Sequence, residues 1–317
     1  MAAMPVIALP SHVQGQPRQR IGILSSGTRA TYERLFAAFE AGLSDLGFVP
    51  TRNVALEYHF ADGKFSQLPA LAAGIARDRP DVVLAHSTPA ATAAKRVIAD
   101  IPIVVVGVAD PVGAGLVASL ARPGGNITGI TNISAELTGK RLAIMKELMP
   151  TLTRIAVIVN PDDPNARLQL QNAADAAVSL GLRLDPVLEL RRADELATVF
   201  HEADKSGASA AIRMVDPLNN ILRKSFVALA QKHRLPIVYA FREDTEAGGL
   251  ISYGASQSAQ FRQAATFIGK ILKGAHPRDL PVEQPTKFEL VINQRTAHAL
   301  GLAIPQSLRL SADTVIE

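Results

Sequence analysis

The sequence predicts an α/β fold of two Rossmann-like lobes, each with a parallel sheet, joined by a multi-segment hinge. Short β-rich runs alternate with amphipathic helical segments along most of the chain, which is typical of parallel sheets whose strands are connected by helices. The run RIAVIV at 154–159 resembles RIGILS at 20–25, and a polar loop and a helical pattern follow each of them. With 317 residues the chain has the length of two ordinary domains.

The first half of the chain contains one set of strands and helices. Its apolar runs predict strands, and the amphipathic segments between them predict helices. The strands are expected at 20–25, 53–60, 81–86 and 102–107, and the helices near 30–46, 66–78 and 89–99. Leu46-Gly47 gives the first helix a C-terminal cap, because glycine adopts the left-handed conformation that ends many helices.

A dense turn signal, ARPGGN at 121–126, separates this set from a second one. There we expect strands at 154–159, 183–190, 209–215 and 236–240, and helices near 164–180, 192–206 and 219–233. The last part of the chain contributes to both lobes, with a strand-to-helix junction at 248–256, a helix at 257–273 and a strand at 287–293. Several crossings of this kind predict a hinge with a cleft.

The expected division of the chain is a tail at 1–19 and two lobes. The N-terminal lobe is expected to comprise 20–123 and 251–283, and the C-terminal lobe 124–250 and 284–317. The opening segment MAAMPVIALPSHVQGQ lacks the basic region and the long apolar region of a complete secretory signal. It is either a disordered cytoplasmic tail or the end of a signal peptide whose start lies upstream, and the second interpretation is favoured.

Composition excludes several classes of chemistry. The chain contains no cysteine, which excludes disulfides, thiolate catalysis and cysteine-bound metals. The net charge of +4 is spread without blocks of Lys or Arg, so no nucleic-acid partner is expected. No apolar stretch approaches the roughly 20 residues that span a bilayer. The seven histidines lack the spacing of metal ligands, so no metal site is expected.

Ligands of open α/β sheets bind at the carboxyl ends of the strands, and the loops expected there are rich in hydroxyl and acidic side chains. These loops are 25–29, 86–89, 107–113, 160–165, 215–219 and 240–244. In HSTP, Ser87 or Thr88 can cap a helix that begins at Pro89, and the N–H groups of that helix can hold a carboxylate. The alternative is that Thr88 only caps its own helix, and SSGT at 25–28 has the same two interpretations.

Isolated acids on these loops suit the other end of a zwitterion. Asp110, Asp162 or Asp216 can hold an ammonium group, while the hydroxyl-rich loops take the carboxylate. Asp163 precedes Pro164 and is interpreted as a helix N-cap followed by the first helical residue.

Four aromatic side chains are candidates to flank an aromatic or apolar part of the ligand: Tyr32, Tyr239, Phe241 and Tyr253. Each alone is more often a core residue than a ligand contact. His86 is the one histidine on an expected ligand loop, and we interpret it as a strand-end residue that the backbone satisfies.

Nucleotide binding and catalysis find little support. GAGLVA at 113–118 matches the dinucleotide fingerprint G-x-G-x-x-A, but Ala109 to Val112 separate it from the preceding strand. Pro123-Gly124-Gly125 then ends its helix within about ten residues, too soon for the βαβ unit. The sequence contains no P-loop and no G-x-S-x-G elbow, and no loop pairs a nucleophile with a base. We therefore expect no cofactor and no enzymatic activity.

Several long motifs resemble those of one known family. GVADPVGAGLVASLARPGGNITGI, NISAELTGKRLAIMKELMP, GGLISYGAS and DLPVEQPTKFELVINQRTAHALGLAIPQSL are similar to the ABC-transporter substrate-binding proteins of the tryptophan/tyrosine-binding type. The likeness extends from about Arg20 to the C-terminus. It implies the type I periplasmic binding protein fold, a periplasmic location, a monomer, and one amino acid or related carboxylate enclosed by hinge closure and delivered to the permease subunits of an ABC transporter.

The resemblance also assigns the ligand site to the loops described above. The residues expected to bind the ligand are Ser25, Ser26, Thr28, Ser87, Thr88, Asp110, Asn160, Asp162, Asp216, Tyr239, Phe241 and Arg242. Two other classes remain open. One is a cytoplasmic ligand-sensing module of the same fold, although the residues before Arg20 are too few for a DNA-binding helix-turn-helix. The other is an enzyme on a two-lobe scaffold.

Overall fold

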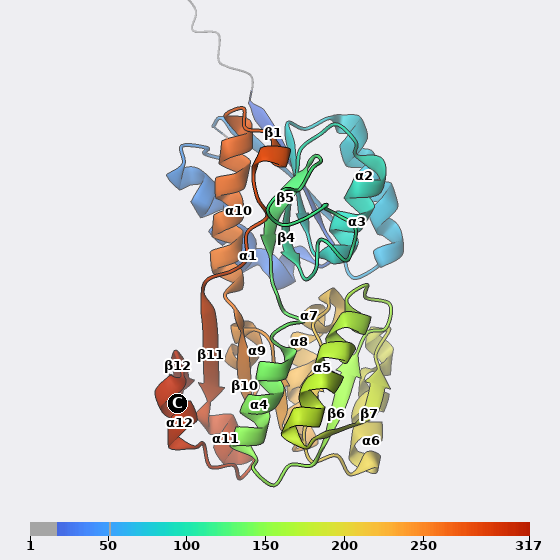
Figure 1. Cartoon of the computed structure of the whole chain (residues 1–317), viewed down its shortest axis with the longest axis vertical. Coiled ribbons are helices and arrows are strands. Elements are labelled where there is room, and N and C mark those ends of the chain that lie inside the picture. Colours follow the sequence, from blue (N-terminus) through green and yellow to red (C-terminus); the bar gives the residue numbers. More distant parts are fainter. Residues whose placement is uncertain (1–17, 51) are drawn as a thin grey trace, which may run out of the picture.

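The structure, a computed structural model, describes residues 18–50 and 52–317 and consists of two α/β lobes stacked along the long axis (Figure 1). The tail expected at 1–19 lies outside the described residues except for Arg18 and Gln19. The N-terminal lobe has a five-stranded sheet in the order β2-β1-β3-β4-β5, and the C-terminal lobe a seven-stranded sheet in the order β12-β11-β10-β9-β8-β6-β7. All neighbouring strands are parallel except β10 and β11. The predicted α/β fold of two lobes is confirmed.

Helices cover both faces of the N-terminal sheet. Its elements are β1 (Gln19–Ser25), α1 (Arg29–Asp45), β2 (Val54–Phe60), η1 (Phe65–Gln67), α2 (Leu68–Asp78), β3 (Val82–His86), α3 (Thr88–Val97), β4 (Ile103–Val108), β5 (Ile127–Thr131), α10 (Gln257–Leu272) and η3 (Pro277–Asp279). Ile21 and Ile23 of β1 pack toward α1 and α10, whereas Leu24 packs toward α2 and α3. Because both faces are buried, β1, β3 and β4 are apolar on successive residues rather than on alternate ones.

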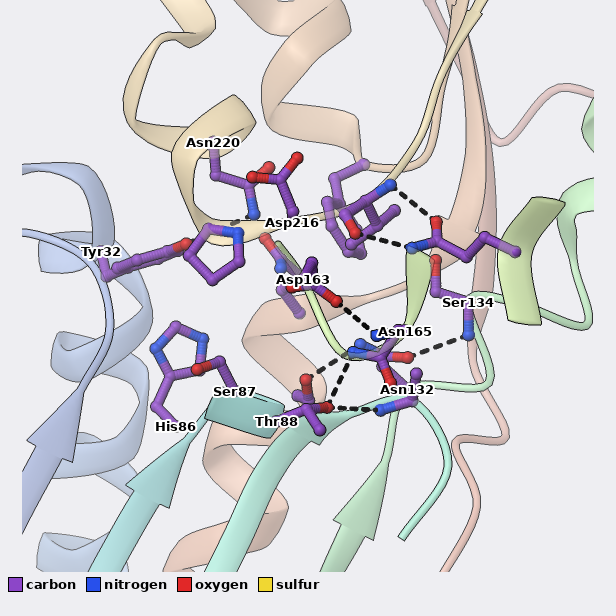
Figure 2. A pocket seen from close by; sticks show the side chains of 17 residues that line it. Tyr32, His86, Ser87, Thr88, Asn132, Ser134, Asp163, Asn165, Asp216 and Asn220 are labelled. Atoms are coloured by element: carbon purple, nitrogen blue, oxygen red, sulfur yellow. Dashed lines mark hydrogen bonds between the residues drawn. The ribbon is translucent and has the colours of Figure 1, made fainter. Parts of the chain in front are cut away.

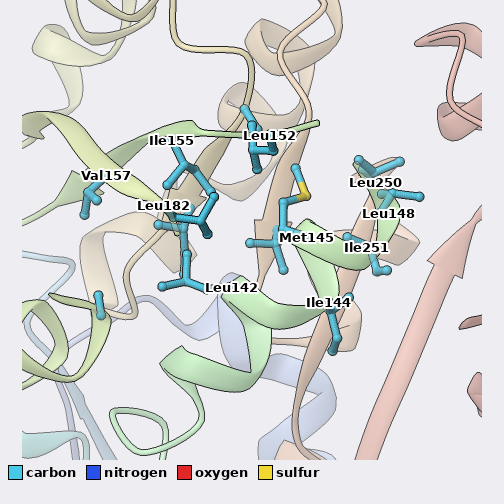
Figure 3. Packing of buried hydrophobic residues seen from close by; sticks show 14 of the residues in the cluster. Leu142, Ile144, Met145, Leu148, Leu152, Ile155, Val157, Leu182, Leu250 and Ile251 are labelled. Atoms are coloured by element: carbon cyan, nitrogen blue, oxygen red, sulfur yellow. The ribbon is translucent and has the colours of Figure 1, made fainter. Parts of the chain in front are cut away.

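The C-terminal sheet is likewise covered on both faces. Its elements are α4 (Thr138–Leu148), β6 (Arg154–Val159), α5 (Ala166–Leu180), β7 (Arg183–Glu189), η2 (Ala193–Glu195), α6 (Leu196–Ser206), β8 (Ala211–Arg213), α7 (Pro217–Ile221), α8 (Arg223–Lys232), β9 (Ile237–Tyr239), α9 (Arg242–Glu246), β10 (Ile251–Ala255), β11 (Phe288–Asn293), α11 (Gln294–Ala299), α12 (Gln306–Ser311) and β12 (Thr314–Ile316). Leu142 and Met145 of α4 pack on Ile155 and Leu182 in one core, which Figure 3 shows. The opposite face packs against α6 and α8.

Three segments cross between the lobes. The first connects β5 to α4, the second connects β10 to α10 at Ser256, and the third connects η3 to β11. The expected boundary at 123/124 lies before β5, which pairs with β4, so the chain leaves the N-terminal lobe only after Thr131. The turn at Pro123-Gly124-Gly125 therefore introduces a β-branched strand of the same sheet and is not the hinge. Likewise β10 pairs with β9 and β11, so the crossing follows Ala255 and not Leu250.

Two local differences from the expected elements lie near the cleft. The helix expected at 219–233 is two helices, α7 and α8, which meet at Leu222. The Arg213 guanidinium contributes to this arrangement, because its Nη1 donates to the carbonyl oxygen of Asn219 over 2.7 Å. The loop expected at 240–244 contains the start of α9. Within the described part of the chain, every helix is too short or too polar to cross a membrane.

Candidate functional site

A narrow pocket with about 30 Å³ of free space lies between the two lobes (Figure 2). Its N-terminal wall is formed where β3 and β4 end, and its C-terminal wall where β6 and β8 end. Asn132 and Ser134 of the first hinge crossing and Gln257 at the start of α10 complete the lining. The position is the one where parallel α/β sheets bind ligands, since the carboxyl ends of both sheets face each other.

The N-terminal wall presents the start of α3. Ser87 precedes this helix with φ 85° and ψ 158°, a conformation that side-chain-bearing residues rarely adopt, and its hydroxyl lies 2.6 Å from that of Ser26. Thr88 Oγ1 accepts a hydrogen bond from Nδ2 of Asn165 over 2.9 Å and a longer one from the Ala109 N–H over 3.4 Å. Because N–H donors occupy its lone pairs, the Thr88 hydroxyl is left to donate its proton to a ligand.

His86 forms the aromatic part of the same wall. Its Nδ1 lies 3.0 Å from Ser25 Oγ, and the ring of Tyr32 meets it edge-on with 4.4 Å between ring centroids. Burial lowers the pKa of His86 to about 3, so the imidazole is neutral. The expected backbone partner is replaced by the Ser25 hydroxyl. Gly107 leaves room for the ring, because a Cβ there would lie 3.2 Å from His86 Cδ2.

The C-terminal wall carries two buried acids, Asp163 and Asp216. Burial and the negative charge of Asp216 raise the pKa of Asp163 to about 7, and burial raises that of Asp216 to about 6. Asp216 Oδ1 accepts hydrogen bonds from the Asn219 N–H over 3.0 Å and from Asn160 Nδ2 over 3.4 Å, whereas its Oδ2 has no partner among the described residues. An ammonium group between the acids would stabilise their ionised forms.

The two walls touch each other. Asn165 of the C-terminal lobe donates to Thr88 of the N-terminal lobe, and Asn220 Nδ2 donates to the Tyr32 hydroxyl over 3.3 Å. No Lys or Arg is present among the described residues that line the pocket. An anionic group of a ligand therefore meets neutral donors, namely hydroxyls and the N–H groups at the start of α3.

Four of the residues predicted from sequence line this pocket: Ser87, Thr88, Asp216 and Phe241. Three others lie behind the lining and contact it through hydrogen bonds: Ser25 to His86, Ser26 to Ser87, and Asn160 to Asp216. These seven residues are thus brought together from both lobes.

The other five lie elsewhere: Thr28, Asp110, Asp162, Tyr239 and Arg242. Thr28 caps α1 by accepting from the Thr31 N–H over 3.0 Å, and Asp110 accepts from the Gly113 N–H over 2.8 Å. Asp162 points to Arg191, 3.8 Å away.

Tyr239 ends β9 and Arg242 follows it, but neither side chain lines the pocket. Tyr239 packs in the core with its ring 5.2 Å from the Arg213 guanidinium. Arg242 forms ion pairs with Glu246 over 2.9 Å and with Glu289 over 3.4 Å.

Sequence reasoning missed most of the polar lining: Asn132, Ser134, Asp163, Asn165, Gln169, Asn220 and Gln257. Asn132 and Ser134 follow β5, a strand absent from the sequence-based prediction, and so they lie outside the predicted ligand loops. Asp163 was interpreted only as a cap, and it does accept from the Asn165 N–H over 2.7 Å while also facing the pocket. Asp216 caps α7 and Asn220 lies one turn into this helix, and both line the pocket.

The chain is similar in sequence to known proteins. Over residues 29–316 the chain matches the family model described as ABC transporter substrate binding protein. It is 26% identical over 301 residues to the tyrosine-binding protein of Clostridioides difficile (strain R20291). This alignment covers 94% of this chain and 84% of the relative.

Two solved structures are also similar. The ABC domain in complex with L-Trp from Streptococcus pneumonia is 25% identical and superposes with a TM-score of 0.87. The superposition covers 94% of this chain and 100% of the chain in that structure. The ligand-free, open structure of CD0873, a substrate-binding protein with adhesive properties from Clostridium difficile, is 24% identical, covers 94% and 99%, and has a TM-score of 0.68.

Proposed function

This chain belongs to the ABC transporter substrate-binding proteins, as its motifs predicted, and we propose that it captures an aromatic amino acid outside the cytoplasm and delivers it to the permease of an ABC importer. Members of this family bind solutes without transforming them, so the chain is not an enzyme. The proposed location is the periplasm, and the proposed state in solution is a monomer.

The observation that carries the proposal is the pairing of opposite chemistries across one pocket. Asp163 and Asp216 are buried acids that form no ion pair among the described residues, while Thr88 and the start of α3 provide hydrogen-bond donors. An amino acid has both complements, an ammonium group and a carboxylate, within one small molecule. This arrangement supports a zwitterion more than a sugar, whose hydroxyls would leave the two acids without a positive partner.

The aromatic part of the proposal has two supports. Tyr32 and His86 form an aromatic wall, and Phe241 lies in the lining as well. Rings of this kind favour edge-on contact with another aromatic ring. The relatives named above, which are described as binding tyrosine or L-Trp, are consistent with such a ligand.

Closure of the lobes explains how binding leads to delivery. The direct contacts from Asn165 to Thr88 and from Asn220 to Tyr32 are those of a closed form. The higher TM-score against the L-Trp complex than against the open, ligand-free structure supports the same assignment. A ligand that contacts both lobes shifts the population toward this form, and a permease that recognises the closed form then receives loaded protein.

The proposal is tested by isothermal titration calorimetry against the protein amino acids, with sugars and nucleotides as the contrasting panel. We expect L-tryptophan or L-tyrosine to bind with a Kd of about 1 μM or below, which corresponds to a binding free energy of about −8 kcal/mol or more favourable. If every amino acid bound weaker than about 1 mM while a sugar or nucleotide bound tightly, the proposal would be wrong. Fractionation of cells that express the gene with its native upstream region tests the periplasmic location.

A further inference from the structure

Arg141 of α4 is a fully buried guanidinium that no carboxylate pairs with among the described residues. Its Nη2 donates to the carbonyl oxygen of Ser134 and, over 3.1 Å, to Ser134 Oγ. Its Nε and Nη1 have no hydrogen-bond partner in the described part of the chain. Burying such a charge without a counter-charge is costly, so its position requires a reason.

A second buried arginine in the same lobe, Arg213, does form an ion pair with a buried carboxylate. Arg213 donates to Asp244 Oδ2 over 2.6 Å and to the carbonyl oxygen of Asn219 over 2.7 Å. Asp244 also pairs with Arg223 over 2.9 Å. Arg213 thus has its counter-charge within the core, and Arg141 does not. Burial and the nearby charge of Arg213 lower the pKa of Arg141 to about 9, which leaves it protonated at neutral pH.

Ser134 connects Arg141 to the pocket. Ser134 lines the pocket, and its Oγ accepts the N–H of Arg141, so its own proton is directed to another acceptor. The segment is fixed from both sides, because the Ser134 N–H donates to Asn132 Oδ1 over 2.9 Å and Thr138 Oγ1 donates to the Ser134 carbonyl oxygen over 3.3 Å. A hydroxyl that accepts from a charged donor is a stronger donor itself.

We propose that Arg141 is a positioning residue that acts through the Ser134 hydroxyl and selects ligands that carry a carboxylate. The inference rests on the proposed function, since it assigns the anionic subsite of the same pocket. Thr88 from the N-terminal lobe and Ser134 from the hinge then offer two hydroxyl protons to one carboxylate, and the Arg141 charge supplies the counter-charge through a medium of low dielectric constant. The ligand carboxylate in turn compensates the unpaired guanidinium.

The test compares a carboxylate-bearing probe with its decarboxylated form. Calorimetry with L-tryptophan and tryptamine, and with L-tyrosine and tyramine, gives for each pair the ratio of the affinity for the amino acid to the affinity for the amine. In Arg141→Met we expect the affinity for the amino acid to fall about tenfold or more while that for the amine changes less than about threefold. The melting temperature of the ligand-free variant should stay equal or rise, because an apolar side chain of similar length replaces an unpaired buried charge.

Two further variants separate selection from folding. Ser134→Ala is expected to lower the ratio by a similar factor, and adding Arg141→Met to it should lower the ratio little further, because both act through one hydroxyl.

The outcomes distinguish the two proposals. An unchanged ratio in Ser134→Ala, or equal losses for acid and amine in Arg141→Met, overturns the role of Arg141 and leaves the proposed function standing. If Arg141→Met fails to fold, the ratio in Ser134→Ala decides. Wild-type protein that binds none of the amino acids overturns both.

Discussion

Asn165 of the C-terminal lobe donates from Nδ2 to Oγ1 of Thr88 in the N-terminal lobe over 2.9 Å, so the rim of the pocket is itself a contact between the lobes. The Thr88 hydroxyl is at the same time one of the donors proposed for the ligand carboxylate. A ligand that accepts its proton strengthens the acceptor site that Asn165 uses, because hydrogen bonds in series polarise one another. In the proposed complex, binding and closure are therefore linked through the Thr88 hydroxyl.

Removing this contact should favour the open form. In Asn165→Ala we expect the ligand to dissociate about fivefold faster, since a buried neutral hydrogen bond contributes about 1 kcal/mol. Stopped-flow fluorescence measures the dissociation rate, and small-angle scattering measures the fraction of compact protein without ligand. The control is Arg34→Ala, whose ion pair with Glu246 also spans the lobes at 2.8 Å but is 79% exposed at the arginine. Equal acceleration in the two variants would contradict a special role of the rim contact.

The two pocket acids should matter for binding far more than for folding. Asp163→Asn or Asp216→Asn removes the charge but keeps an acceptor oxygen for the backbone N–H bonds of Asn165 and Asn219. We expect the affinity for an amino acid to fall about tenfold or more in each variant, with no loss of melting temperature in the ligand-free protein.

The matched control is the neighbouring acid. Asp162 is also an aspartate on this loop, but its side chain is 61% exposed and points to Arg191. Asp162→Asn should therefore bind like the wild type. A loss of affinity in Asp162→Asn as large as in Asp163→Asn would show that the loop, and not the buried charge, is what the ligand requires.

The raised pKa values of the acids predict opposite effects of pH on stability and on binding. The folded, ligand-free protein has pKa values of about 7 and about 6 at Asp163 and Asp216, whereas an unfolded aspartate has about 3.9. Between about pH 4 and 7 the folded state therefore holds more protons, and the free energy of unfolding falls as pH rises through this range. An ammonium ligand binds the ionised acids, so its affinity should rise with pH over the same range and each binding event should release protons.

Both effects of pH, on the free energy of unfolding and on the affinity for the ligand, can be measured. Denaturant unfolding at several pH values gives the stability of the ligand-free protein, although other titrating groups contribute to the curve, so the difference between wild type and Asp163→Asn isolates this acid. Calorimetry in two buffers of different ionisation enthalpy counts the protons released on binding. An affinity for L-tryptophan that is constant from about pH 5 to 8, with no proton release, would contradict the contact between ammonium and acids.

The fold was predictable from sequence because its signals are local. Apolar runs such as RIGILS and RIAVIV are buried on both faces of their sheets, and the strands β1 and β6 lie within one residue of the predicted bounds. The strand β5 was missed because ITGIT has only five residues, contains a glycine and follows a Pro-Gly-Gly turn. Missing it moved the expected hinge upstream and hid Asn132 and Ser134, which follow that strand.

The site was only partly predictable, because the position of a residue on a ligand-facing loop does not determine which way its side chain points. Asp162 and Asp163 are adjacent, and only the second faces the pocket. Tyr239 ends a strand at the cleft, yet its side chain packs in the core beside Arg213, while Phe241 two residues later reaches the lining. The role inferred for Arg141 could not be predicted from sequence, because it depends on the observation that this buried guanidinium lacks an ion-pair partner among the described residues.

The strained backbone of Ser87 gives a prediction about stability at the centre of the pocket. With φ 85° and ψ 158°, Ser87 has a conformation that is nearly confined to glycine and costs a residue with Cβ about 1–3 kcal/mol. Ser87→Gly and Ser87→Ala both lose the 2.6 Å contact with Ser26, and only the alanine keeps the strain. Since glycine also gains about 0.5–1 kcal/mol of freedom in the unfolded chain, we expect Ser87→Gly to be the more stable variant by about 1 kcal/mol. Urea unfolding of the two proteins measures the difference, and an alanine variant as stable as the glycine variant would mean that the backbone at Ser87 relaxes when the hydroxyl contact is absent.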